Sequence, residues 1–97
     1  MDVLSFIRPK SKALAETEYE KGRVYAFESM INIYMLFRKN YDQTRQSIYF
    51  FTYITKMIDM CGQRKDDFSK GQVNAYEETF NYFKPSRRKD LKCMIQD

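Results

Sequence analysis

The sequence predicts an all-α protein, a small helical bundle of three principal helices, on three observations. Apolar residues recur at spacings of three and four through most of the chain, which is the period of one helix face. The chain has only two prolines and three glycines, the residues that most often interrupt helices. The links between the periodic stretches are short, which favours antiparallel neighbouring helices. We therefore expect a single helical domain over residues 1–97, with a short segment at each end.

The first principal helix is predicted over residues 11–39, with Ser11 as its N-cap. The apolar segment before it, residues 3–7, fits either one or two helical turns or an extended arm. Gly22 is a candidate break in this helix. Over residues 24–37, two adjoining apolar stripes cover more than half of the helix circumference. Such a helix needs cover on several sides, so we expect it to be the central helix or to face a partner as well.

The second principal helix is predicted over residues 42–61. Asn40 and Gln43 match the two ends of a capping box at its start. The middle of this stretch is rich in aromatic and β-branched residues, so propensity alone also allows a strand. Its apolar residues nevertheless follow a helical spacing, with threonines and charged residues on the opposite side, and this favours a helix. Gly62 is expected to end it.

The third principal helix is predicted over residues 69–84. Ser69 and Gln72 match a capping box at its start. Pro85 is expected to end the helix, because the residue before a proline avoids helical geometry. Ser86 then becomes a candidate N-cap for a short final helix.

The residue types needed for catalysis are scarce. The sequence contains no histidine, which removes the commonest general base and the commonest metal ligand. It also lacks the glycine-rich loops G-x-x-x-x-G-K-[ST] and G-x-G-x-x-G that bind phosphate groups. Its two cysteines, Cys61 and Cys93, do not form a C-x-x-C pair. We therefore expect no enzymatic activity, no cofactor and no metal site.

The cysteine content and the N-terminal residues favour a reducing cytoplasm as the compartment. Two cysteines are fewer than a small secreted domain usually carries, and the first ten residues do not resemble a signal peptide. No segment approaches the 18 consecutive apolar residues of a transmembrane helix, so no membrane association is expected. Cys61 falls on the apolar face of its helix and is expected to be buried. Cys93 is expected to be a passive thiol near the end of the chain.

Tyrosine is frequent, with 8 residues against no tryptophan. A tyrosine combines a large apolar ring with a polar hydroxyl, which suits partly exposed surfaces and interfaces. On the second helix, Tyr49, Tyr53 and Met60 lie beside the main apolar face, and Tyr41 comes just before that helix. These four residues are the candidate partner-binding residues. The alternative is that they form the edge of the core.

A short basic segment accounts for the whole net charge of +4. The segment covers residues 84–92 and contains five basic residues and one acidic residue, Asp90, so its own net charge is five minus one, or +4. They are candidates for binding nucleic acid or an acidic protein surface: Lys84, Arg87, Arg88, Lys89 and Lys92. The alternative is a solvated tail that keeps the protein soluble.

These observations favour a non-enzymatic accessory protein, an adaptor or inhibitor that docks on a larger protein. One alternative is a nucleic-acid-binding accessory protein that uses the basic segment. Another is a self-assembling structural subunit, because the broad apolar surface of the first helix also suits a homo-oligomer. The sequence carries no family motif. In its general character, which is short, aromatic-rich and without catalytic residues, it resembles small bacteriophage proteins that disable host nucleases and defence complexes. That resemblance implies an inhibitor.

Overall fold

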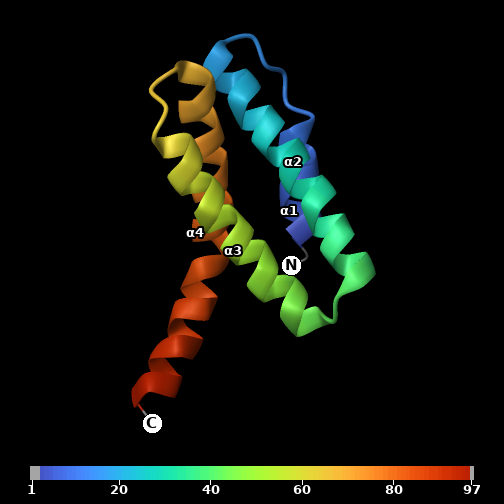
Figure 1. Ribbon diagram of the computed structural model, residues 1–97, viewed down its shortest axis with the longest axis vertical. Helices are drawn as coiled ribbons and strands as arrows, with labels where there is room; N and C mark the ends of the chain where they lie inside the picture. The colour runs from blue at the N-terminus through green and yellow to red at the C-terminus, as the bar shows by residue number, and fades with distance from the viewer. Residues whose placement is uncertain (1–2, 97) are drawn as a thin grey trace.

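The computed structural model describes the backbone of residues 3–96 and the side chains of residues 3–83. Over that range the chain forms helices and no strand, so the all-α prediction is confirmed (Figure 1). In chain order the helices are α1 (Val3–Ser11), α2 (Glu18–Asn40), α3 (Gln43–Gly62) and α4 (Asp67–Gln96). Over the described residues the structure has four helices where three principal ones were predicted, because the N-terminal segment continues through Pro9 to Ser11 as a helix of its own. Neither α2 nor α3 nor the described part of α4 is both long and apolar enough to cross a membrane.

The start of α2 differs from the prediction. Ser11 ends α1, where its Oγ donates a hydrogen bond to the Arg8 carbonyl at 2.8 Å, instead of capping the next helix. Thr17 is the N-cap of α2. Its Oγ1 accepts from the Glu20 backbone N–H at 3.1 Å, and Glu20 Oε1 accepts from the Thr17 backbone N–H at 3.0 Å. This pair completes a capping box, whereas Leu14 stands at the corresponding position after Ser11 and offers no carboxylate.

Helix α3 lies within one residue of its predicted range, but its cap was assigned to the wrong residue. Asp42 is the N-cap, and its carboxylate accepts from the Arg45 backbone N–H at 2.9 Å. Asn40 is the last residue of α2, and its amide donates to the Leu36 carbonyl at 2.8 Å. Asn40 therefore belongs to the end of one helix and does not cap the next.

Helix α4 begins earlier and ends later than predicted. The carboxylate of Asp66 accepts hydrogen bonds from the Ser69 backbone N–H at 3.0 Å and from the Ser69 hydroxyl at 2.9 Å. Ser69 and Gln72 are buried within the helix and do not form its cap. The helix also continues through Pro85 to Gln96. A proline removes one backbone hydrogen bond and disfavours helical geometry before it, but this is a preference that a helix can override.

Helices α2 and α4 start at the same end of the molecule and run in the same direction (Figure 1). Their backbones touch at two glycines. A Cβ atom added to Gly22 would lie 1.9 Å from the carbonyl oxygen of Phe68, and one added to Gly71 would lie 1.9 Å from that of Tyr19. The sequence position of Gly22 suggested a break in the helix, but α2 continues through it. Gly22 allows the two helices to cross without a side chain between them.

The core lies where α2 meets the other three helices, which confirms the prediction that this helix is central. The apolar residues buried in it come from all four helices: Leu4, Ile7, Ala26, Phe27, Met30, Phe50, Ile54, Cys61, Ala75 and Tyr76. Cys61 is 5% exposed, in agreement with its predicted burial. The buried Thr79 donates its hydroxyl to the Ala75 carbonyl at 3.0 Å. Within the part of the chain whose side chains are described, no buried side-chain nitrogen or oxygen lacks a hydrogen-bond partner.

Candidate protein-binding face

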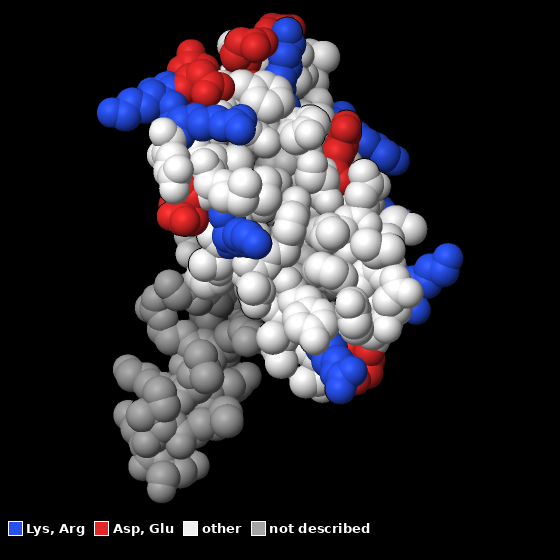
Figure 2. All heavy atoms as spheres, in the orientation of Figure 1, with Lys and Arg blue, Asp and Glu red and all other residues white. Residues whose placement is uncertain are grey.

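The side of the molecule formed by α2 and α3 is mostly uncharged, and most of the Lys, Arg, Asp and Glu side chains in view lie toward its margins (Figure 2). Lys56 lies three residues after Tyr53 and four before Met60, so helical spacing places it on this side of α3. We call this side of the molecule the α2–α3 face. We define it by residues that helical spacing and mutual contacts place along the two helices: Tyr25, Leu36, Phe37, Tyr41, Tyr49, Tyr53, Met57 and Met60. Five of them are large apolar or aromatic side chains that are at least 40% exposed: Tyr25, Leu36, Tyr41, Tyr49 and Met60. Exposed apolar residues grouped in this way commonly mark interaction sites.

Three aromatic rings cluster at the end of the face next to the α2–α3 turn. The ring centroids of Tyr41 and Tyr49 lie 4.8 Å apart in a T-shaped arrangement. Phe37 lies 5.9 Å from Tyr41 and 6.1 Å from Tyr49. The amide of Gln46 donates to the Tyr41 carbonyl at 2.7 Å and fixes the backbone of the turn. The cluster is thus held in place before any partner arrives, which lowers the entropy that binding would cost.

Tyr53 lies between the two ends of the face and is half-buried. Its hydroxyl is 3.2 Å from the hydroxyl of Tyr76, which is fully buried. Burial raises the pKa of Tyr53 above its ordinary value. Burial, together with the neighbouring Tyr53 hydroxyl, also raises the pKa of Tyr76. Both hydroxyls are therefore harder to ionise than that of an exposed tyrosine, and their contact connects the face to the core.

The other end of the face contains a hollow of about 280 Å³. Its walls include Tyr25 and Met60, which are 53% and 52% exposed, and the half-buried Met57 and Phe68. The rings of Tyr25 and Phe68 are 5.5 Å apart, so α2 and the start of α4 support each other there. Cys61 lies deeper in the hollow, and burial raises the pKa of its thiol, which keeps it in the neutral form.

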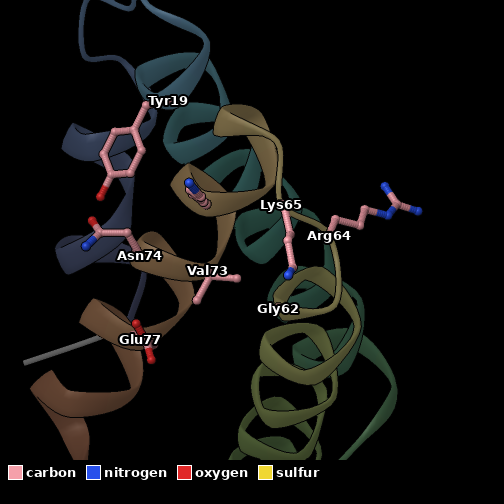
Figure 3. Close-up of a pocket in the computed structure, with 8 residues that line it drawn as sticks. Tyr19, Gly62, Arg64, Lys65, Val73, Asn74 and Glu77 are labelled. Carbon is pink, nitrogen blue, oxygen red and sulfur yellow. The ribbon is translucent and has the colours of Figure 1, made fainter.

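A second, larger hollow of about 570 Å³ lies beside the start of α4, with several charged side chains in its lining (Figure 3). It is lined by Tyr19, Gly62, Arg64, Lys65, Lys70, Val73, Asn74 and Glu77. Figure 3 shows Tyr19 and Lys65 on opposite sides of α4, with the side chain of Arg64 directed away from the other labelled residues. The charged lining residues of this hollow are the basic Arg64, Lys65 and Lys70 and the acidic Glu77. The residues described here contain no group of three or more His, Cys, Asp or Glu side chains that would hold a metal ion.

The four predicted partner-binding residues all lie on the α2–α3 face but not in one cluster. Tyr41 and Tyr49 pack against each other, Tyr53 is half-buried behind them, and Met60 lines the hollow at the far end. The basic residues predicted to bind nucleic acid or an acidic surface (Lys84, Arg87, Arg88, Lys89 and Lys92) lie outside the described side chains, as does Cys93.

The contribution of Leu36 and Phe37 from α2 was missed. Leu36 lies eleven residues after Tyr25, a spacing that puts both side chains on one side of a helix. That spacing is visible in the sequence. Apolar residues, however, cover more than half of the helix circumference over residues 24–37, so the sequence does not separate the buried side of the helix from the exposed side. No protein-family model, curated protein or solved structure matches this chain.

Proposed function

We propose that this chain is a non-enzymatic accessory protein, an adaptor or inhibitor, that docks on a larger protein through the α2–α3 face. The observation that supports this is the grouping of five exposed apolar or aromatic side chains along two adjoining helices and the turn between them, on a mostly uncharged side of the molecule. Tyrosine and methionine are enriched in interface cores, where charged residues are depleted.

The geometry of the aromatic cluster suits a binding hot spot. Tyr41 and Tyr49 each bury part of the ring against a neighbour and present the rest to solvent, at 40% exposure. Rings fixed in this way lose little freedom on binding, and their hydroxyls can hydrogen-bond at the rim of an interface. Loss of such a residue typically weakens a complex by about 2 kcal/mol or more, roughly 30-fold in Kd.

In its narrower form the proposal is an inhibitor of a host nuclease or defence complex. This form is supported by the resemblance in general character to small bacteriophage proteins. It predicts that the captured partner is a nuclease or a component of a defence complex, and that added chain lowers the activity of that partner.

The experiment is affinity capture from bacterial lysate with and without nuclease treatment, using the wild-type chain and matched variants. The proposal expects a stoichiometric protein partner that survives nuclease and that the double variant Tyr41→Ala, Tyr49→Ala no longer captures. Ile48→Ala is the control, because Ile48 is the exposed neighbour of Tyr49 on the other side of α3 and lines a separate hollow. A partner retained by the double variant would contradict docking through this face.

The same experiment separates the two alternatives. Protein bands that disappear after nuclease treatment, or after the basic residues Arg87, Arg88 and Lys89 are replaced with Ala, would favour nucleic-acid binding. Self-assembly predicts that the chain is larger than a monomer at high concentration in sedimentation experiments.

A further inference from the structure

The hollow between Tyr25 and Met60 has one charged residue in its lining, Arg64. At about 280 Å³ it falls just below the size range of sites that hold drug-sized ligands or cofactors. Its walls are the aromatic rings of Tyr25 and Phe68 and the flexible chains of Met57 and Met60. A hollow of this size and lining suits one large apolar side chain of a partner, the arrangement found at binding hot spots.

Arg64 is held at the rim of this hollow by the backbone. The backbone N–H of Arg64 donates to the Cys61 carbonyl at 3.1 Å, and this bond closes the turn after α3. In Figure 3 the Arg64 side chain points away from the neighbouring Lys65, and both residues line the larger hollow beside the start of α4. Consecutive residues of the turn therefore project their charges in different directions. Arg64 lines both hollows, whereas Lys65 lines only the larger of the two.

The guanidinium of Arg64 forms no ion pair among the described side chains. Asp66 is close enough for the charge of Arg64 to contribute to the lowered pKa of its carboxyl, but the main cause is the hydrogen bond from the Ser69 backbone N–H. Both oxygens of Asp66 are engaged by Ser69 at the start of α4. An arginine beside an apolar site favours a carboxylate, because its planar fork can donate two parallel hydrogen bonds to one.

We propose that this hollow and Arg64 together recognise a partner segment in which a large apolar side chain lies next to a carboxylate. The apolar side chain enters between Tyr25, Met57, Met60 and Phe68, and the carboxylate pairs with Arg64 at the rim. This inference rests on the proposed function and specifies the chemistry of the partner at one end of the α2–α3 face. The carboxylate fixes register and speeds association, while the apolar side chain supplies most of the affinity.

The test uses random 12-residue peptides displayed on phage and selected on the folded wild-type chain. The expected consensus is a large apolar residue flanked by Asp or Glu. The affinity of the enriched peptides is then measured by fluorescence anisotropy for Arg64→Glu and for Lys65→Glu. These two variants make the same charge change at adjacent positions, so bulk charge effects cancel in the comparison.

We expect Arg64→Glu to weaken peptide binding by about tenfold or more, as loss of a charge-assisted hydrogen bond does, and Lys65→Glu to change it by less than about twofold. Met60→Ala should also weaken binding, whereas Met35→Ala, which removes a similarly exposed methionine (48%) outside the face, should not. The inference is overturned if no peptides are enriched, if the consensus lacks acidic residues, or if Lys65→Glu weakens binding as much as Arg64→Glu.

The failure of this inference can be told from failure of the proposed function. If the double variant Tyr41→Ala, Tyr49→Ala loses the protein partner while Arg64→Glu retains it at full affinity, docking through the face stands and the acidic epitope does not. If neither change affects partner capture, both fail.

Discussion

Gly22 of α2 lies against the backbone of Phe68 in α4, so close that an added Cβ would sit 1.9 Å from the Phe68 carbonyl oxygen. No side chain other than the hydrogen of glycine fits there without moving the helices. Gly71 makes the reciprocal contact with Tyr19. The two glycines therefore set the distance between the helices that share the largest contact in the molecule.

Gly22→Ala is expected to destabilise the protein by about 1–3 kcal/mol, the usual cost of overpacking, even though alanine is the better helix former. Gly62→Ala is the matched control. A Cβ at Gly62 would meet nothing within 4 Å, and its φ is not positive, so this variant should be neutral or slightly more stable. Urea unfolding followed by circular dichroism measures both. Equal stability of the two variants would show that the close crossing is not required.

Thr17→Ala should cost about 1 kcal/mol, because it removes the side-chain cap of α2. Ser11→Ala should have little effect, because Ser11 is the last residue of α1 and its hydroxyl only adds a bond to the Arg8 carbonyl. Thermal unfolding of the two variants distinguishes the observed helix start from the one predicted at residue 11. A larger loss for Ser11→Ala would support the start at residue 11.

Glu78 joins three helices, since it pairs with Lys10 of α1 at 3.1 Å and with Arg23 of α2 at 3.0 Å. Partial burial alone would raise the pKa of Glu78, but the hydrogen bonds from Lys10 and Arg23 outweigh it and lower the pKa below its ordinary value of 4.5. A pKa lowered by folding contributes stability above the unfolded value, and this contribution is lost as the pH falls through the folded value.

Wild-type stability should therefore fall more steeply below pH 4.5 than that of Glu78→Gln, which has no carboxylate to protonate at this position. Urea midpoints between pH 7 and pH 3 test this. Glu77→Gln is the control, because Glu77 forms no ion pair among the described side chains and its replacement removes no ion pair between helices. Parallel profiles for Glu78→Gln and wild type would contradict the assignment.

Tyr53→Phe should destabilise the protein by about 1 kcal/mol, because it removes a hydrogen-bond partner of the buried Tyr76 hydroxyl. Tyr41→Phe, at an exposed ring, should cost much less. Because burial raises the pKa of both Tyr53 and Tyr76, part of the stability present below pH 10 should be lost as the pH rises beyond it. Urea unfolding curves measure the stability of the variants and its loss above pH 10, and absorbance titration of the phenolates measures the raised pKa values.

Much of the fold was predictable from the sequence, and the errors have identifiable causes. The range of α3 was predicted to within one residue because its apolar face repeats without interruption and residues 40–43 mark its start. The N-caps were misplaced where two residues with capping side chains lie close together in the sequence. Ser69 has the side chain of an N-cap, but its own backbone N–H donates to the carboxylate of Asp66, three residues earlier. Gly22 is a candidate break from the sequence alone, because a close helix crossing is a relationship between distant segments and leaves no local pattern.

The candidate site was predictable only on α3. Helical spacing placed Tyr49, Tyr53 and Met60 on one side of that helix, and the structure brings them to the α2–α3 face. The α2 part was hidden, because which side of a broadly apolar helix stays open depends on how its three neighbours pack. The role proposed for Arg64 has no signal in the sequence, because it depends on the direction in which a turn residue projects.

The most direct test of docking through the α2–α3 face is the affinity of the captured protein partner for Tyr49→Ala and for Ile48→Ala, measured by calorimetry at equal salt. The two residues are adjacent, both on α3, 40% and 48% exposed, and on different sides of the helix. We predict a loss of about 30-fold or more for Tyr49→Ala and less than about twofold for Ile48→Ala. Unchanged affinity for Tyr49→Ala, or an equal loss for both variants, would contradict the proposal.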